Sequence, residues 1–312
     1  MDTNKSIISL SHNDLDGIGC QVVLRWQYTN VYYKNISYNR IYDTLVELDN
    51  NLDYDRTKSQ IIISDLSLKA NEILLLKTIC EKNPDVKIIL ADHHIRTPDI
   101  VELYKSFPKN FIDLHTEQQC SAMILFYYFG INNNKIRDLI ELINSYDLWL
   151  VDRANFMDAL ILNEIYEGMT HQDFFNSIGF YGNVKEDITR KIDKTKTKIQ
   201  SFQDGIIQNN YIYYNDKIVV AHIDRYKSIL QYYLDRPVSV IISSNFNFSV
   251  RVSNAVKDYE LIEIRNLFFD YFNSKKYNYY YAHKQVFGFN STETTVIDDI
   301  DSFLLFIGEK FN

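Results

Sequence analysis

Residues 7–20 of the chain read IISLSHNDLDGIGC. A short apolar run, residues 7–10, gives way to His12, Asp14 and Asp16 on alternate positions, with Gly17 directly after them. Side chains at positions i, i+2 and i+4 of extended backbone point the same way, so these three are expected to face one site. Gly17 is expected to permit a tight turn into a helix, whose N-terminus is a ready anion-binding position. A buried strand that ends in such side chains indicates a functional site.

Two later segments repeat this arrangement of a short isoleucine-rich run followed by acids or histidines. The run QIIISDLS reaches Asp65, and the run KIILADHH reaches Asp92, His93 and His94. Runs of this length and composition are typical of strands buried on both faces of a parallel sheet. Helical patterns separate them, and this alternation predicts an α/β fold. The expected helices cover residues 16–28, 67–83 (with Ser67 as N-cap) and 119–130, and a fourth strand is expected at 110–115.

The polar residues at these strand ends are expected to converge, because ligands bind beyond the carboxyl ends of the strands in open parallel sheets. A further helix is predicted within residues 136–149, where apolar residues recur at helical spacing. This helix brings Asp147 to its C-terminal end. Its apolar stripe consists of Ile136, Leu139, Ile140 and Ile143.

The character of the sequence changes after about residue 180. We predict a catalytic domain over residues 1–180, a charged helical connector over 181–210 and a smaller α/β domain over 211–312. In this last part, two strands are expected within residues 211–224, joined at Asn215-Asp216. Further strands are expected at 238–244 and 248–254, and helices at 228–235 and 259–272.

Composition excludes several classes of protein. The 312 residues carry a net charge of -8, which argues against a protein that coats long nucleic acid with a basic surface. The three cysteines form no CxxC pair and are expected to be free thiols in a reducing compartment. The first residues lack the features of a signal peptide, and no apolar run approaches the roughly 20 residues that span a membrane. We therefore expect a cytoplasmic protein.

The convergent residues have the chemistry of a metal centre. Carboxylate and imidazole ligands suit Mn, Fe, Zn or Mg, and carboxylates brought close together need a compensating cation to stay ionised. A pair of divalent ions about 3.5–4 Å apart acidifies water and draws charge off a phosphoryl group. Taken singly, Asp65 could be a helix cap, His93 and His94 a solvated loop and Asp147 a solvent-facing residue. Taken jointly, the segments favour the metal centre, formed by His12, Asp14, Asp16, Asp65, His93 and Asp147.

Four motifs carry a family resemblance. The segments SHNDLDGIGC, SDLS, ADHH and YDLW, in this order over residues 11–149, resemble the four motifs of the DHH phosphoesterases. The first and last are most similar to those of NrnB-type oligoribonucleases, or nanoRNases, which degrade very short RNA. The resemblance implies a DHH domain followed by a DHH-associated domain, and a metal-dependent hydrolase with two Mn²⁺ ions, with Mg²⁺, Co²⁺ or Fe²⁺ as alternatives. A homodimer is expected by analogy with the family.

The resemblance also implies a role for each matching residue. His12 and Asp14 would bind the first metal, Asp16, His93 and Asp147 the second, and Asp65 would bridge both ions. His94 would contact the scissile phosphate. Asp92 would orient a histidine of the site without binding a metal itself.

The C-terminal half departs from the pattern of a DHH-associated domain. That domain carries a glycine-rich stretch ending in histidine, whereas this chain has NYYYAHKQVFGF, with residues 279–282 at the glycine positions. Without glycines the backbone cannot approach phosphate as closely. Tyr281 and its neighbours would either stack on bases or belong to a packed strand. The candidate substrate-binding residues are Arg251, His283, Lys284 and Tyr281.

We predict a two-metal phosphodiesterase that cuts short oligonucleotides from one end and releases mononucleotides. A second hypothesis is hydrolysis of a cyclic dinucleotide or another signalling nucleotide, which would differ only in the second domain. A third, non-enzymatic hypothesis is a nucleotide-binding or sequestering protein on a decayed scaffold. In each case the expected partner is a small nucleotide, with neither long double-stranded nucleic acid nor a membrane.

Overall fold

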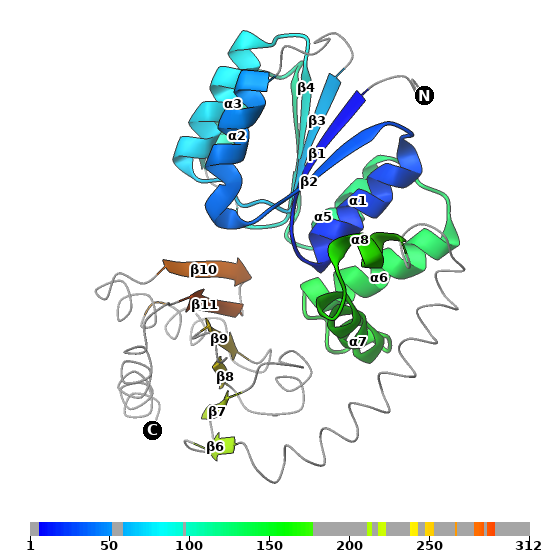
Figure 1. The fold of residues 1–312 in the computed structure, drawn as a ribbon, viewed down its shortest axis with the longest axis vertical. Coiled ribbons are helices and arrows are strands. Elements are labelled where there is room, and N and C mark those ends of the chain that lie inside the picture. Colours follow the sequence, from blue (N-terminus) through cyan, green and yellow to red (C-terminus); the bar gives the residue numbers. More distant parts are fainter. Residues whose placement is uncertain are drawn as a thin grey trace. The chain divides into compact units, whose positions relative to one another are not determined.

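The computed structural model describes residues 6–51, 59–95 and 98–176, together with Asn266 and the residues of six strands after residue 210. The chain divides into two compact units, Met1–Thr195 and Lys196–Asn312. The two units are described separately below (Figure 1).

A five-stranded parallel sheet forms the centre of the first unit. Its strands lie in the order β2-β1-β3-β4-β5. The predicted α/β fold with an N-terminal parallel sheet is thereby confirmed. The edge strand β2 was not predicted, because its sequence VYYKNI is mostly half-exposed and lacks a buried isoleucine run. The strands are β1 (Ser6–His12), β2 (Val31–Ile36), β3 (Ser59–Ser64), β4 (Lys87–Asp92) and β5 (Phe111–His115).

Helices cover both faces of this sheet (Figure 1). The pair α2 and α3 packs together on one face with α4, whereas α1 and α5 pack together on the other. Helix α6 lies against α1, and α7 packs on α6. The described helices are α1 (Leu15–Gln27), α2 (Ile41–Asn51), α3 (Ala70–Lys82), α4 (Pro98–Ser106), α5 (Ser121–Tyr128), α6 (Asn134–Asp147), α7 (Phe156–Glu167) and α8 (His171–Phe174), with a 3₁₀ turn, η1 (Tyr38–Arg40).

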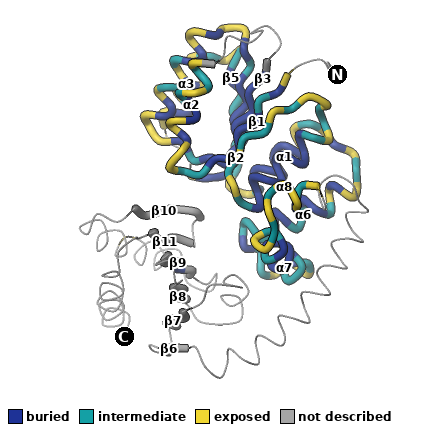
Figure 2. Tube along the Cα trace, viewed as in Figure 1, coloured by how far each residue is buried: buried dark blue, intermediate teal, exposed yellow. Residues whose placement is uncertain are grey.

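The central strands are buried on both faces, which explains their unbroken isoleucine runs (Figure 2). Ile61 and Ile63 of β3 join the apolar cluster under α2, α3 and α4. Ile62 alternates to the opposite face and is 0% exposed. The apolar stripe predicted for α6 is buried in full, and the helix ends at Asp147.

The start of α3 differs from the prediction. Ser67 is not its N-cap, because the helix begins at Ala70 and Lys69 occupies the cap position. The backbone N–H of Lys69 donates to Glu72 Oε2 at 2.7 Å. The carboxylate of Glu72, three residues after the cap, thus satisfies a donor at the helix start.

The first motif does not stay extended as far as expected. Strand β1 ends at His12, Asp14 is the N-cap of α1 and Asp16 already lies inside the helix. The reason is that the Asp14 carboxylate accepts a hydrogen bond from the Gly17 N–H at 2.9 Å and starts the helix at once. Gly17 is required for close approach rather than for a turn. A Cβ on it would lie 1.9 Å from the carbonyl oxygen of His12.

The second unit contains a six-stranded sheet in the order β10-β11-β9-β8-β7-β6, in which β7 and β8 are parallel and the other pairs antiparallel. Strands fall in the segments predicted for them. The predicted connector over 181–210 and the helix over 228–235 lie outside the described residues, as does the helix over 259–272 except for Asn266. The predicted domain boundaries therefore stay predictions. The strands are β6 (Tyr211–Tyr213), β7 (Ile218–His222), β8 (Val238–Ile242), β9 (Asn247–Val252), β10 (Asn278–His283) and β11 (Val286–Asn290).

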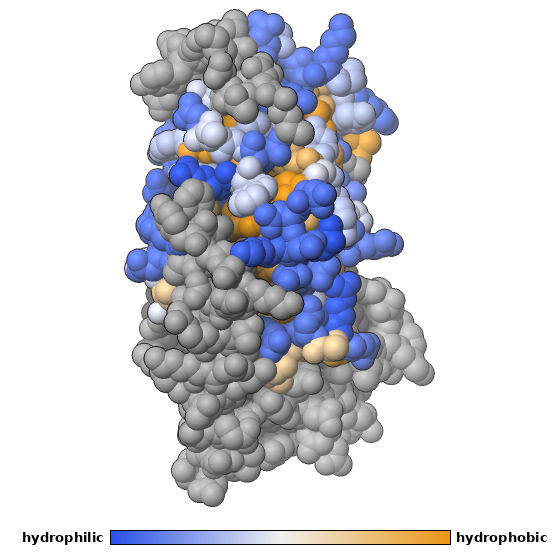
Figure 3. Space-filling model, turned by 90° about the vertical axis from the view of Figure 1, so that its right-hand side faces the viewer, coloured by the Kyte–Doolittle hydropathy of each residue, from blue (hydrophilic) through white to orange (hydrophobic). Residues whose placement is uncertain are grey.

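Among the described residues, none of the helices has the length and apolarity that crossing a bilayer requires. The described side chains on the face seen in Figure 3 are mostly hydrophilic, with apolar ones in small separate areas.

The close approach at Gly17 makes a testable prediction. In Gly17→Ala the new methyl group meets the backbone of His12, which cannot rotate away as a side chain would. We expect the free energy of unfolding to fall by about 1–3 kcal/mol, measured by denaturant titration with circular dichroism. Gly168→Ala, at the exposed end of α7, is the comparison variant: its Cβ would lie 3.3 Å from the carbonyl oxygen of Glu164, so the free energy of unfolding should fall by less than in Gly17→Ala. Equal stability of the two variants would contradict the packing described here.

Candidate metal centre

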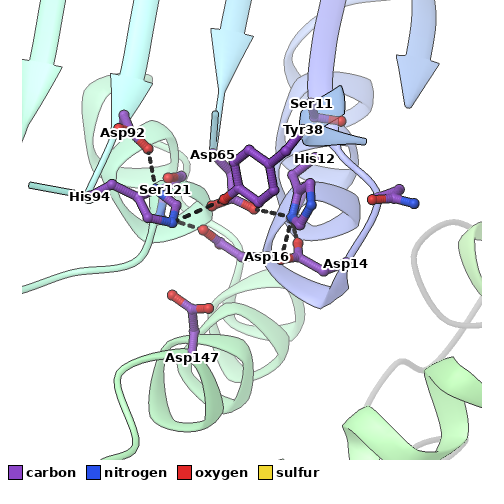
Figure 4. A network of polar contacts seen from close by, with 12 residues as sticks. Ser11, His12, Asp14, Asp16, Tyr38, Asp65, Asp92, His94, Ser121 and Asp147 are labelled. Atoms are coloured by element: carbon purple, nitrogen blue, oxygen red, sulfur yellow. Dashed lines mark hydrogen bonds and ion pairs between the residues drawn. The ribbon is translucent and has the colours of Figure 1, made fainter. Parts of the chain in front are cut away.

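The predicted ligands gather at the carboxyl edge of the first sheet (Figure 4). His12 is the last residue of β1, Asp65 follows β3, and Asp92 is the last residue of β4. The chain leaves β1 for β2 on one side and returns to β3 on the other. Such a reversal of strand order opens a crevice at the strand ends, which is where open α/β sheets bind their ligands.

Asp65 stands between two groups of ligands. Its Oδ2 lies 3.9 Å from His12 Nδ1, and its Oδ1 lies 3.5 Å from His93 Nε2. The residue is 1% exposed, and Oδ2 accepts no hydrogen bond from the described part of the chain. Its backbone is left-handed, with φ 56°. One carboxylate that faces a histidine on each side has the arrangement of a bridging ligand.

The remaining predicted metal ligands surround Asp65 on two sides. Candidate ligand atoms of His12, Asp14 and Asp65 lie within 4.8 Å of one another, as do those of Asp65, His93 and His94. On the second side, His93 Nε2 lies 3.2 Å from Asp147 Oδ2 and 4.0 Å from Asp16 Oδ2. The structure thus brings together the six residues predicted as metal ligands: His12, Asp14, Asp16, Asp65, His93 and Asp147.

A cysteine also lies close to this group, which the sequence did not suggest. A candidate ligand atom of Cys120 falls within 4.8 Å of those of Asp16 and Asp147. Burial and the neighbouring charge of Asp16 hold the pKa of the Cys120 thiol well above its ordinary value. In the protein without metal this group is a neutral thiol that lies beside the carboxylate and imidazole donors.

The carboxylates at this edge have strongly perturbed pKa values. Burial and the charges of Asp14 and Asp16 raise the pKa of Asp65 well above its usual range. Burial and the charge of Asp147 raise the pKa of Asp16 to about 6. Asp14 is the exception: burial opposes its ionisation, but its 2.6 Å contact with His12 Nδ1 brings its pKa well below the ordinary value. Mutual repulsion of this kind is relieved by cations, so the donor set fits divalent metal ions.

Asp16 also binds the N-terminus of α5, a contact that was not predicted from the sequence. Its two carboxylate oxygens accept hydrogen bonds from the backbone N–H groups of Ser121, at 2.7 Å, and Ala122, at 2.9 Å. These residues form the first turn of α5, whose free N–H groups attract an acceptor. Asp16 is thereby held in one orientation and joins the first motif to α5.

Asp92 and His94 form a buried pair beside the ligands. His94 Nδ1 lies 2.8 Å from Asp92 Oδ1, so the other ring nitrogen, Nε2, is left to face the site. Burial alone would lower the pKa of His94, but Asp92 raises it to about 9. The predicted role of Asp92 as the residue that orients a histidine agrees with this contact.

Three further residues support the site and were not predicted to do so. The hydroxyl of Tyr38 lies 3.2 Å from His94 Nε2. His115 Nε2 lies 2.8 Å from the carbonyl oxygen of His94, and the hydroxyl of Tyr166 donates to the carbonyl oxygen of Asn13 at 2.8 Å. Tyr38 follows the unpredicted strand β2, and Tyr166 lies on a helix for which no pattern was identified. His115, at the end of β5, carried only the general signal of a polar residue at a strand end.

The predicted substrate-binding residues lie in the second unit, where the structure describes only their backbone. Arg251 lies on β9 and pairs with Val286 of β11, which pairs with His283 of β10. Arg251 and His283 thus share one rung of the sheet with a single strand between them. Tyr281 lies on β10, as the strand interpretation of the tyrosines required. Lys284 lies outside the described residues.

Comparison with known proteins gives two curated relatives. A 3′,5′-cyclic-nucleotide phosphodiesterase from Helicobacter pylori is 29% identical over 160 residues, which are 46% of this chain and 43% of that protein. The oligoribonuclease NrnB from Bacillus subtilis is 25% identical over 173 residues, 53% of this chain and 42% of that protein. The matches therefore span less than half the length of either relative. No family model matches the chain.

Two solved structures share the fold. One is described as the DHH domain of a member of a family of ribosomal proteins, with a TM-score of 0.63 and 12% identity over 97% of this chain and 86% of that chain. The other is a pGpG-specific phosphodiesterase from Vibrio cholerae, with a TM-score of 0.56 and 11% identity over 98% of this chain and 99% of that one. The resemblance predicted from the four motifs is confirmed by these comparisons together with the curated relatives.

The raised pKa values predict how stability depends on pH. A carboxyl whose pKa is raised in the folded state stabilises the fold below its ordinary value of 3.8, and this contribution is lost as the pH rises through about 6, the folded value of Asp16. His94, raised from 6.5 to about 9, adds a further loss above neutral pH. We therefore expect the melting temperature of the metal-free protein to fall from about pH 4 to pH 9.

Metal should reverse this trend, because ions bind the deprotonated carboxylates. The rise in melting temperature on adding Mn²⁺ should be larger at pH 8 than at pH 5, by differential scanning fluorimetry in EDTA and in Mn²⁺. In Asp16→Asn the metal-free curve should be flatter between about pH 4 and pH 7. A metal-free melting temperature that increases across this interval would show that the carboxylates do not repel one another as described.

Proposed function

We propose that this chain, which its motifs and relatives support as a DHH family phosphoesterase, is a two-metal phosphodiesterase that hydrolyses short oligonucleotides and releases nucleoside monophosphates. The observation that carries the proposal is Asp65, a buried carboxylate with a histidine facing each of its two oxygens. A structural role alone does not explain four acids crowded together at one edge of a sheet.

The position of each ligand relative to Asp65 indicates which of the two ions it would bind. His12 and Asp14 would hold one ion, Asp16, His93 and Asp147 the other, and Asp65 would contact both. We infer Mn²⁺ from the family resemblance, with Mg²⁺, Co²⁺ or Fe²⁺ as alternatives. Such ions supply acidified water and neutralise charge on the phosphoryl group. The protein supplies the orientation: Asp14 through its contact with His12, and Asp16 through its two bonds to α5.

His94 is the group that we assign to the phosphate. Its Nδ1 is held by Asp92, so Nε2 is the ring nitrogen that can reach a substrate. In the metal-free protein the pKa of His94 is raised to about 9, and a proton on Nε2 would donate a hydrogen bond to a phosphate oxygen beside the Tyr38 hydroxyl, which lies 3.2 Å from the same nitrogen. Asp92 thereby contributes through His94 rather than through a contact of its own with the substrate.

A small substrate is favoured by charge and by the names of the relatives. The net charge of -8 disfavours long polyanions, whereas a substrate of a few nucleotides meets mainly the local cationic site. Both curated relatives are named for action on nucleotide phosphodiesters. We assign to the predicted domain over residues 211–312 the binding of the rest of the substrate, through Arg251, His283, Lys284 and Tyr281.

A second candidate is the hydrolysis of a cyclic or signalling nucleotide. It is favoured by the Helicobacter pylori relative, which is named a 3′,5′-cyclic-nucleotide phosphodiesterase. The ligand set would be the same, so only turnover separates the two candidates. A non-catalytic nucleotide binder is disfavoured, because binding alone does not need the complete set of six ligands that includes Asp65.

The proposal is tested with the full chain, Mn²⁺ and labelled RNA of two to five nucleotides, beside cyclic dinucleotides and 3′,5′-cyclic mononucleotides. We expect mononucleotides from the linear substrates at higher kcat/KM than from any cyclic one. Turnover of cyclic substrates alone would select the second candidate. If Mn²⁺ binds, as shown by calorimetry, but no phosphodiester is cleaved, the enzyme hypothesis is wrong and nucleotide binding should be measured instead.

Asp65→Asn should abolish this turnover. Asparagine tolerates the left-handed backbone, so the variant removes the charge and leaves the chain path unchanged. We expect a loss of kcat/KM larger than the roughly 10–100-fold typical of residues that only support a ligand. Asp85→Asn is the matched control, because Asp85 is exposed and precedes β4 at the opposite edge of the sheet. Its kinetics should equal those of the wild type.

A further inference from the structure

Tyr38 touches both ends of the candidate site although no motif contains it. Strand β2 pairs with β1 so that Ile36 lies opposite His12, and Tyr38 follows two residues later as the first residue of η1. Figure 4 shows the tyrosine among the residues of the site, where it contacts His12 and His94.

Its aromatic ring contacts His12. The centroids of the Tyr38 and His12 rings are 4.4 Å apart, with an angle of 40° between the ring planes. His12 also contacts Asp14 and Asp65 through Nδ1. A ring packed against the imidazole limits its rotation and keeps that nitrogen directed toward the carboxylates.

Its hydroxyl contacts His94. The hydroxyl oxygen lies 3.2 Å from His94 Nε2, and the two rings meet edge to face at 6.2 Å. Since Asp92 holds Nδ1, the imidazole of His94 has a partner on each nitrogen and its plane is defined from both sides.

We infer that Tyr38 is a positioning residue that orients His12 with its ring and His94 with its hydroxyl, and so couples metal binding to phosphate contact across Asp65. The part that concerns His94 rests on the proposed function, whereas the part that concerns His12 needs only the metal centre. The two parts use different atoms of one side chain. They can therefore be separated by substitution.

Tyr38→Phe keeps the ring and removes the hydroxyl, and Tyr38→Leu removes both. We expect Tyr38→Phe to bind Mn²⁺ within twofold of the wild type by calorimetry, with kcat lower by about 10–100-fold and KM little changed. Tyr38→Leu should lose kcat to at least the same extent and also bind Mn²⁺ about 10-fold more weakly. The matched controls are Tyr42→Phe and Tyr42→Leu, because Tyr42 is an exposed tyrosine four residues further along. Both should match the wild type.

Equal loss of Mn²⁺ affinity in Tyr38→Phe and Tyr38→Leu overturns the inference, as does wild-type kcat in Tyr38→Phe. A wild type without turnover refutes the proposed function instead. In that case the contact between the Tyr38 hydroxyl and His94 is tested by the ¹⁵N chemical shift of His94 Nε2. This shift should differ between wild type and Tyr38→Phe and should be the same in wild type and Tyr42→Phe. An unchanged shift overturns the inference on its own.

Discussion

The repulsion among carboxylates crowded at one edge of the first sheet is the constraint on which the site depends. Asp14 and Asp16 come from the start of α1, Asp147 from the end of α6 and Asp65 from the loop after β3. The pKa values of Asp16 and Asp65 are raised by burial together with the charges of their neighbours. An arrangement of this kind costs stability unless something positive occupies it. In the folded protein without metal, the repulsion among these carboxylates is unfavourable, and the binding of cations would relieve it.

Backbone structure supplies much of what makes this crowding tolerable. The first motif starts a helix immediately after β1, and Gly17 lets that helix approach the His12 carbonyl. Asp16 is then placed at the N-terminus of α5, where two N–H groups bond its oxygens while lone pairs remain for a ligand. Helix α6 brings Asp147 from the other direction as its last residue. The site is built from the ends of regular elements, which explains how its atoms are held without flexible loops.

The buried strands and the residues at their ends could be predicted from the sequence, because unbroken isoleucine runs and the polar residues after them are local signals. Strand β2 could not, since an edge strand with half-exposed residues has no such run, and Tyr38 was missed with it. The bonds from Asp16 to α5 join positions more than 100 residues apart, for which no pattern in one sequence exists. The first helix begins at Leu15, within one residue of the prediction, but the extended backbone expected from His12 to Asp16 was wrong, because the Asp14 side chain caps the helix there. The Arg251–His283 rung of the second sheet depends on strand pairing, which local patterns do not specify.

The left-handed backbone at Asp65 has a consequence for how such a protein diverges. Few residues accept φ 56° at low cost, chiefly glycine, asparagine and aspartate. A single nucleotide change in an aspartate codon yields asparagine or glycine, either of which would keep the chain path while deleting the shared charge. A single point mutation at Asp65 would thus give a folded protein that lacks the proposed bridging ligand and the repulsion between Asp65 and the neighbouring carboxylates.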